Sequence, residues 1–208
     1  MSSKGEQTRT EIVQAARILF YRKGYHHTSF TDIVEEAGVV RGNVYHYFKT
    51  KDDLLGAVIE QHLAQYKVLL DTWEQEKTTP LKRLKRFTHM LIDRGDDLRQ
   101  FGCPVGTLST ELAKNSTSEP NPARALLDLF KDWLTRQFIL MGFGSDAGKL
   151  ALHLLGRAQG ISILTHVYRD TDWLADEVKQ MEVWLTSLSP KPAPTKTARK
   201  KTSTAQRG

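Results

Sequence analysis

Residues 28–48 decide the fold, and they read Thr-Ser-Phe-Thr-Asp-Ile-Val-Glu-Glu-Ala-Gly-Val-Val-Arg-Gly-Asn-Val-Tyr-His-Tyr-Phe. Two short amphipathic segments lie on either side of Gly38, and a glycine supplies the positive φ that a tight turn between helices often needs. Two helices joined by such a turn form a helix-turn-helix, whose second helix enters the major groove of DNA. The stretch therefore predicts sequence-specific binding to double-stranded DNA.

The second helix of this motif is expected over residues 41–47. At about 100° per residue, its apolar positions fall on one side and its polar positions on the other. The polar side centres on Gly42 and His46 and carries no acid, which suits entry into a major groove. Arginine there reads guanine or phosphate, and asparagine pairs with adenine. The expected core side consists of Val40, Val44, Tyr47 and Phe48, and the polar side is flanked by Arg41, Asn43 and Tyr45.

DNA contacts are expected from both helices of the motif and from the start of the following helix. Hydroxyl and imidazole groups hold phosphates and fix the register, and free N–H groups at helix N-termini bind phosphates as well. The alternative is an ordinary helical corner, but three consecutive rings at 45–47 cannot all be buried on one short helix. The candidate DNA-binding residues are Thr28, Ser29, Thr31, Arg41, Gly42, Asn43, Tyr45, His46, Tyr47 and Lys51.

These residues resemble the tetracycline-repressor (TetR/AcrR) family of regulators, from Arg9 to about Leu55. The resemblance implies an all-helical homodimer whose N-terminal head binds a palindromic operator and whose C-terminal body binds a small-molecule effector. It also implies repression until an inducer binds. Val40 departs from the family pattern, where a Ser or Thr commonly caps this helix. The matches are Ala15-Ala16, Leu19-Phe20, Gly24-Tyr25, Thr28-Ser29, Asp32-Ile33, Ala37-Gly38-Val39, Gly42-Asn43-Val44-Tyr45-His46-Tyr47-Phe48 and Lys49-Thr50-Lys51-Asp52-Asp53-Leu54-Leu55.

Helical periodicity continues through the rest of the chain, and no strand pattern occurs. We expect an all-α fold with a DNA-binding domain over 1–50, a ligand-binding and dimerisation domain over 51–188, and a disordered basic tail over 189–208. Helices are expected over 8–23, from Ser29, over 41–47, from Thr50, over 79–94, in a short segment to Lys114, from Asn121, over 146–168 and to Leu188. The expected N-terminal caps are Thr8 with Glu11, Ser29 with Asp32, the Thr50–Asp53 run, Thr79, Ser145 and Asp172.

The two last helices are expected to form the dimer interface. The helix over 146–168 has apolar residues around much of its circumference, which calls for neighbours on several sides. Gly156 and Gly160, four residues apart, allow close contact with another helix. We therefore expect a four-helix interface with a two-fold mate.

The net charge of +6 does not by itself identify a nucleic-acid partner. The tail over 189–208 holds six of the 30 basic residues and no acid, and the remainder has 24 basic and 24 acidic residues. The DNA prediction therefore depends on the motif. For the tail, either weak sequence-independent DNA affinity through counterion release or a solubilising role fits its composition.

Several protein classes lack support in the sequence. No run of 18 apolar residues indicates a membrane span, and the N-terminus shows no secretory signal, so a cytoplasmic protein is expected. One cysteine excludes an internal disulfide framework. No spacing typical of a metal site, phosphate loop or nucleophile elbow occurs, so we expect neither a metal, a cofactor nor an enzyme.

The effector site is predicted to lie on the helices of the body. Candidate pocket residues on the body are His89, Arg94, Cys103, Trp133, Gln159 and His166, with His153 beside them; for each the alternative is a surface or core role. Cys103 lies between glycines near an expected helix N-terminus, which favours a thiolate. There are two alternatives to an inducer-controlled regulator. One is an electrophile-sensing repressor that uses Cys103. The other is a helical small-molecule-binding or thiol enzyme that no longer binds DNA.

Overall fold

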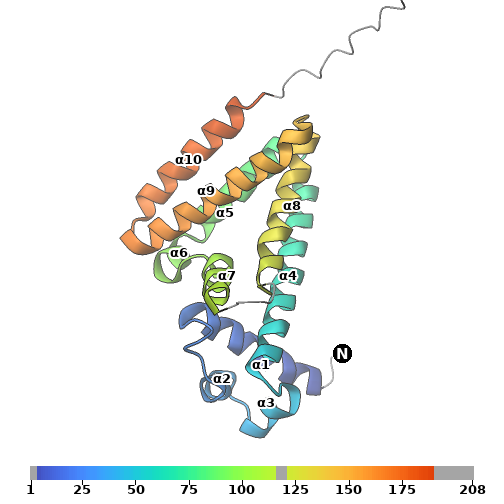
Figure 1. Cartoon of the computed structure of the whole chain (residues 1–208), viewed down its shortest axis with the longest axis vertical. Helices are drawn as coiled ribbons and strands as arrows, with labels where there is room; N and C mark the ends of the chain where they lie inside the picture. Colours follow the sequence, from blue (N-terminus) through green and yellow to red (C-terminus); the bar gives the residue numbers. More distant parts are fainter. Residues whose placement is uncertain (1–3, 116–120, 190–208) are drawn as a thin grey trace, which may run out of the picture.

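The computed structural model describes residues 4–115 and 121–189, and within these ranges all regular structure is helical (Figure 1). This confirms the predicted all-α fold. The expected tail over 189–208 lies outside the described residues from 190 onward. The elements are α1 (Lys4–Arg22), α2 (Phe30–Ala37), α3 (Arg41–Tyr47), α4 (Lys51–Glu76), α5 (Pro80–Asp93), α6 (Gly95–Phe101), α7 (Pro104–Asn115), α8 (Arg124–Leu140), the 3-10 helix η1 (Gly144–Asp146), α9 (Ala147–Tyr168) and α10 (Thr171–Ser187).

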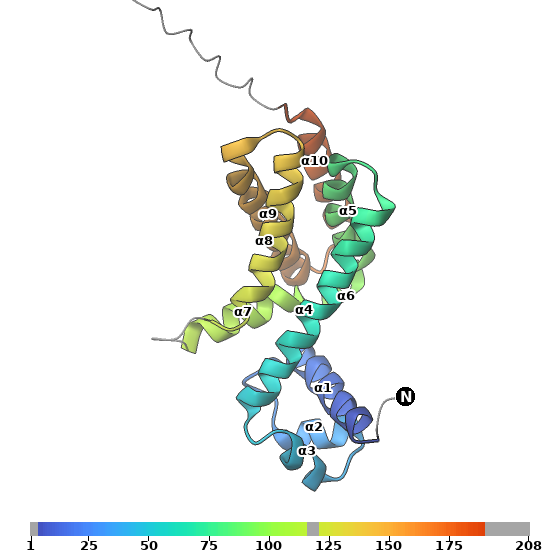
Figure 2. The ribbon, with the colours of Figure 1, turned by 90° about the vertical axis from the view of Figure 1, so that its right-hand side faces the viewer.

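Helices α1, α2 and α3 form a small head at one end of the molecule, and the first turns of α4 close it (Figures 1 and 2). Each helix of the head has apolar residues at helical spacing along one side, and burial of these sides packs the three short helices together. Ile12, Ala16, Ile33 and Val44 are fully buried in its centre, and Leu54 of α4 joins them.

Side-chain caps fix where the head helices begin. Ser29 and Asp32 form a capping box at α2, and Thr50 and Asp53 form another at α4, both as predicted. Gly38 ends α2 with φ 63°, a left-handed conformation that residues with a side chain rarely adopt. This confirms the predicted turn. These caps determine where α2 and α4 begin, and the Gly38 turn determines where α2 ends.

Other predicted caps were wrong. α1 begins at Lys4, so Thr8 lies inside the helix and its hydroxyl donates to the Lys4 carbonyl oxygen at 3.1 Å instead of capping. The last helix begins two residues earlier than the predicted Asp172 cap implied, because the Asp170 carboxylate accepts the Trp173 N–H at 2.9 Å. The predicted Ser145 cap lies inside the 3-10 helix η1, and α9 begins after it at Ala147 without a side-chain cap.

Two boundaries of the body also differ from the prediction. α8 begins at Arg124 and not at Asn121, whose side-chain oxygen accepts the Ala123 N–H at 3.0 Å in the preceding turn. A separate seven-residue helix, α6, follows α5 directly through Arg94, and it was not predicted from the sequence. The predicted start of α5 at Thr79–Pro80 is confirmed, since the Thr79 hydroxyl accepts the Lys82 N–H.

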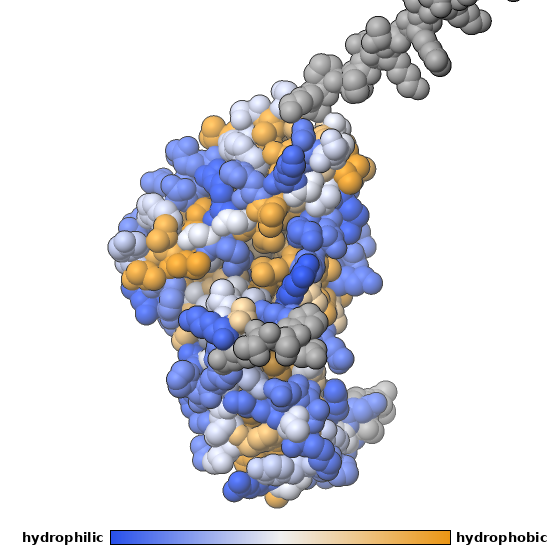
Figure 3. All heavy atoms as spheres, viewed as in Figure 1, coloured by the Kyte–Doolittle hydropathy of each residue, from blue (hydrophilic) through white to orange (hydrophobic). Residues whose placement is uncertain are grey.

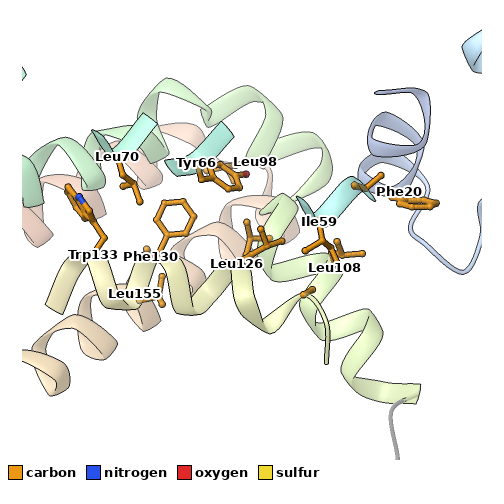
Figure 4. Close-up of a cluster of buried hydrophobic side chains, with 14 of the residues drawn as sticks. Phe20, Ile59, Tyr66, Leu70, Leu98, Leu108, Leu126, Phe130, Trp133 and Leu155 are labelled. Atoms are coloured by element: carbon orange, nitrogen blue, oxygen red, sulfur yellow. The ribbon is translucent and has the colours of Figure 1, made fainter. Parts of the chain in front are cut away.

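The body is a bundle in which α4, leaving the head, packs against α8, while α5, α9 and α10 complete the far end (Figure 2). Its core is continuous with that of the head. Figure 4 shows this continuity as a row of apolar side chains that begins at Phe20 of α1, passes Ile59 of α4 and reaches Trp133 of α8. A shift of the body helices is therefore transmitted to the head through these packed side chains.

Helix α9 leaves an apolar face uncovered. Leu152, Ile163 and Val167 are each more than half exposed on it, and a Cβ added at Gly156 or Gly160 would meet no heavy atom within 4 Å. Figure 3 shows apolar residues on this side of the body, whereas the head surface is mostly hydrophilic.

Candidate DNA-binding surface and effector chambers

Helix α3 lies at the end of the head that is farthest from the body (Figure 1). Val44 and Phe48 bury its inner side, and Tyr47 is half-buried beside them. The predicted polar side, from Arg41 to Asn43 together with Tyr45 and His46, is exposed. A Cβ added at Gly42 would meet no heavy atom within 4 Å, so the backbone there is open to a flat partner.

Aromatic contacts hold this surface in place. The Tyr45 ring stacks on Phe30 of α2 with centroids 5.1 Å apart and planes 19° apart, and it remains 41% exposed. The Arg41 guanidinium lies 5.8 Å from the Tyr45 ring. His46 meets Tyr47 edge-on at 5.0 Å. The polar groups are thus preorganised, which lowers the conformational cost of binding.

Two of the predicted contact residues hold the head together. Thr28 is 1% exposed, and its hydroxyl donates to the Gly24 carbonyl oxygen at 2.7 Å, so its side chain does not reach the surface. The Lys51 ammonium donates to the carbonyl oxygens of Tyr25 and Thr28 at 3.0 and 3.1 Å and lies over the Tyr25 ring. Ser29 and Thr31, at the start of α2, are exposed.

Val40 was predicted to lie on the core side of α3, and this was wrong: it is 74% exposed and occupies the N-cap position of α3 without a capping side chain. The Asn43 N–H is satisfied by the Val40 carbonyl oxygen at 2.8 Å. Lys49, which the sequence analysis did not select, donates to the Tyr45 carbonyl oxygen at 2.9 Å at the other end of the helix. A cation interacts favourably with the dipole at a helix C-terminus. Lys49 also adds positive charge beside the exposed surface of α3.

Two adjacent cavities lie where the head meets the body. The larger one, about 330 Å³, is here called the polar chamber and is lined by Arg17, Tyr21 and Arg22 of α1, His62 of α4, Arg94, and Asp97 of α6. The smaller one, about 40 Å³, is called the apolar chamber and is lined by Phe87, Leu91, Cys103, Phe130, Leu155 and Gln159. Tyr66, Arg94 and Pro104 line both chambers and separate them.

Three of the predicted effector residues lie at these chambers, namely Arg94, Cys103 and Gln159. The Cys103 sulfur accepts the Gly106 N–H at 3.4 Å and the Gln159 side-chain amide at 3.6 Å. A Cβ at Gly106 would lie 2.2 Å from the Gln159 side-chain oxygen, so the Gln159 amide would have to shift if residue 106 carried a side chain.

The other predicted effector residues lie elsewhere. His89 is half-exposed and pairs with Glu182 at 2.7 Å, and Trp133 is fully buried against Trp73. His166 lies 3.2 Å from the Arg99 carbonyl oxygen, outside the lining of both chambers. His153 packs on Trp184. These contacts give all four residues roles in packing or in surface pairing.

Sequence reasoning missed Arg17, His62 and Tyr66 as chamber residues. His62 and Tyr66 are one helical turn apart on α4 and stack with ring centroids 5.6 Å apart and planes 9° apart. Burial, with help from the Arg17 and Arg94 charges, lowers the pKa of His62 to about 4, and burial raises the pKa of Tyr66 to about 12. Both rings are therefore uncharged at neutral pH.

A set of hydrogen bonds, here called the polar joint, links α1 and its following loop to the segment around α6 and α7. The Glu111 carboxylate of α7 accepts the backbone N–H groups of Tyr25 and His26 at 3.0 and 2.7 Å. The Tyr21 hydroxyl donates to the carbonyl oxygens of Gly102 and Asp97 at 2.8 and 3.2 Å. Since α7 begins at Pro104, which lines both chambers, one short helix contacts the chambers and the head.

Comparisons with known proteins agree with this geometry. The pattern of bacterial regulatory proteins of the tetR family matches residues 12–58. An uncharacterized helix-turn-helix-type transcriptional regulator in the lacX 3′ region of Lactococcus lactis subsp. lactis is 31% identical over 171 residues, which cover 80% of this chain and 87% of that protein. The transcriptional repressor DhaR of Mycobacterium sp. (strain GP1) is 26% identical over 127 residues, 61% of each chain.

The fold comparison gives the same result. The crystal structure of a TetR-family transcriptional regulator from Agrobacterium tumefaciens matches with a TM-score of 0.77 at 21% identity, over 87% of this chain and 98% of that one. The class of protein is therefore a ligand-responsive, DNA-binding transcriptional regulator and not an enzyme. The chain belongs to the tetR family of such regulators, whose members bind operator DNA as dimers. No helix in the described part of the chain is long and apolar enough to cross a membrane.

Proposed function

We propose that this regulator is a cytoplasmic homodimeric repressor that leaves a palindromic operator when a small-molecule effector binds in the two chambers. The observation that carries this proposal is the exposed, preorganised polar side of α3 at the outer end of the head. The sequence similarity to a named repressor supports repression as the direction of control.

Each exposed group on the head has a distinct part in operator binding. Arg41 and Asn43 have the side chains that pair with guanine and adenine edges, so they read sequence. Tyr45, His46 and Tyr47 carry donors for phosphate oxygens, and Ser29 and Thr31 lie at the N-terminus of α2, where free N–H groups bind phosphate. Gly42 lets the α3 backbone approach the groove closely. Thr28 and Lys51 support these groups by fixing the loop before α2.

The uncovered apolar face of α9 is the proposed dimer interface. Exposed apolar residues arranged along one helix mark a protein contact surface, and the glycines on that helix permit close helix packing. Two-fold symmetry then presents two copies of α3 to DNA, so each half of the operator is read by one head. The operator is palindromic for this reason.

Control follows from a difference in effector affinity between two arrangements of the heads. In one of these arrangements the two α3 helices do not fit successive major grooves. An effector that binds more tightly to that arrangement shifts the population toward it. The polar joint is the element that changes, because it is made of a few hydrogen bonds next to the chambers.

Genome-wide mapping of bound DNA in cells tests this proposal, with the wild type compared with Asn43→Ala and His46→Ala. We expect the wild type to occupy a few sites that share a palindrome and both variants to lose them. Arg136→Ala, on the exposed side of α8, serves as the matched control and is expected to keep the wild-type sites. Failure of the wild type to enrich any shared sequence, or equal occupancy by His46→Ala, contradicts the proposal.

A further inference from the structure

We propose that the effector is a monocarboxylate with an apolar, preferably aromatic, remainder, and that its carboxylate binds between Arg94 of the body and Arg17 of the head. This rests on the proposed function of the chambers as the effector site, and it specifies which chemistry they accept.

The polar chamber has an excess of positive charge. Arg17, Arg22 and Arg94 line it together with a single acid, Asp97. Within residues 4–115 and 121–189, the Arg94 guanidinium has no hydrogen-bond or ion-pair partner, Arg17 bonds only to the Gln14 side chain at 3.2 Å, and Arg22 lies over the Phe101 ring. Guanidinium groups match carboxylates with two parallel hydrogen bonds, so unpaired arginines in one cavity favour such an anion.

Arg17 and Arg94 act on the same point of the chamber. Both lower the pKa of His62, although they come from segments 77 residues apart in the chain. Because His62 is buried and neutral, one of its ring nitrogens can accept a hydrogen bond from a ligand and the other can donate one. Tyr66 lines both chambers, and its hydroxyl likewise has no partner among the described residues.

The walls of the chambers select the rest of the effector. The polar chamber also contains flat ring surfaces, from Tyr21, His62, Tyr66 and Phe101, against which an aromatic group stacks. The apolar chamber beyond Arg94 is lined by Phe87, Phe130 and Leu155 and has about 40 Å³ of free volume. That volume holds about one water molecule, so an apolar group enters it only when the surrounding helices move apart.

The position of the carboxylate explains how binding affects the head. Arg17 belongs to α1, whereas Arg94 joins α5 to α6. A carboxylate that binds both arginines ties the head to the body in one relative position, directly beside the polar joint. A neutral ligand in the apolar chamber alone has no such hold on α1.

Binding measurements on the purified full-length protein without DNA test this inference. The probes are benzoate, 2-naphthoate and octanoate, each compared with its neutral primary amide by calorimetry and thermal shift. We expect at least one acid to bind and to do so about tenfold or more tightly than its amide, the difference that a charge-assisted hydrogen bond provides. Phenyl phosphate is included to separate a carboxylate site from a phosphate site.

Charge-removing variants identify the groups responsible. Arg94→Gln and Arg17→Gln are each expected to weaken acid binding about tenfold, and the double variant to bind acid and amide equally. Arg94→Lys keeps the positive charge but not the paired N–H donors of the guanidinium group. Its affinity for the acid is expected to lie between those of the wild type and Arg94→Gln. Arg136→Gln, on the exposed side of α8, is the control and should bind like the wild type.

The inference is overturned if no acid binds, if the amides bind as tightly as the acids, if phenyl phosphate binds more tightly than every carboxylate, or if the double variant keeps the acid preference. Since no DNA is present, these outcomes are independent of whether the protein represses a gene. Acid binding by a protein that occupies no genomic site would sustain this inference and refute the proposed function.

Discussion

The head is attached to the body at two places that are built differently. At one of them, here called the apolar joint, α4 runs without a break from the head into the body and buries Leu54, Leu55, Val58 and Ile59. At the other, the polar joint, the Glu111 carboxylate and the Tyr21 hydroxyl bond to backbone groups across the interface.

The difference between the joints indicates which one moves. Burying each large aliphatic side chain contributes about 1.5–3 kcal/mol, and opening the apolar joint would expose four such side chains at once. A hydrogen bond contributes about 1 kcal/mol net, and water replaces it when it opens. We therefore expect the apolar joint to keep the head attached and the polar joint to set its angle. Four substitutions, ordered by their expected effect on the free energy of unfolding, separate these roles.

Leu54→Ala is expected to have the largest effect. Leu54 is fully buried where α4 packs on the head, and removing such a side chain leaves a cavity. The free energy of unfolding should fall by about 2–5 kcal/mol, measured by urea denaturation. Val68→Ala, on the exposed side of the same helix, is the control and should change it by less than about 0.5 kcal/mol. Equal small losses for both variants would show that the apolar joint does not hold the head.

Glu111→Ala removes the acceptor for two backbone N–H groups. We expect a loss of about 1–3 kcal/mol and faster amide hydrogen exchange at Tyr25 and His26, because hydrogen bonds to a charged group are stronger than neutral ones. Glu111→Gln keeps one acceptor and should show an intermediate effect. Glu60→Gln, exposed on α4, provides the control. Unchanged exchange at both amides in Glu111→Ala would argue against the polar joint.

Tyr21→Phe removes the other part of the polar joint. Its ring stays against Phe101, and only the hydroxyl bonds to Gly102 and Asp97 are lost. The expected loss is about 0.5–1.5 kcal/mol in urea denaturation. Tyr168→Phe, in which an exposed ring loses its hydroxyl, should be neutral. A neutral Tyr21→Phe would limit the polar joint to Glu111.

His46→Ala should leave both joints intact. Its exposed ring makes an edge contact with Tyr47 and contributes nothing to the core, so the free energy of unfolding should change by less than about 0.5 kcal/mol. Operator affinity should nevertheless fall about tenfold, measured by fluorescence anisotropy of labelled operator DNA. A substantial loss of stability would assign His46 to the structure of the head.

The head was predicted from sequence in detail because its determinants are local. The Ser29–Asp32 and Thr50–Asp53 boxes, the Gly38 turn and the two sides of α3 each lie within a few residues of one another. Thr28 was misplaced because its burial depends on the packing of the loop around Gly24, which no helical period describes.

The chambers and the polar joint were not predictable in this way. Arg17, His62 and Arg94 come together only when α1, α4 and the α5–α6 connection pack, and His62 and Tyr66 look like part of an ordinary apolar stripe. α6 was missed because seven residues with only Gly95 and Leu98 buried give too little periodicity. Glu111 has no sequence signal at all, since its partners are backbone groups 85 and 86 residues away.

One measurement tests most directly whether the polar joint carries the effector signal. It is the operator affinity of the wild type and of Glu111→Ala, each with and without the acid that stabilises the wild-type protein most. In the wild type the acid should weaken operator binding, by a factor between about 5 and 150. In Glu111→Ala, with acid binding intact, that factor should fall close to one. If Glu111→Ala binds the acid and loses as much operator affinity as the wild type, the polar joint does not carry the signal.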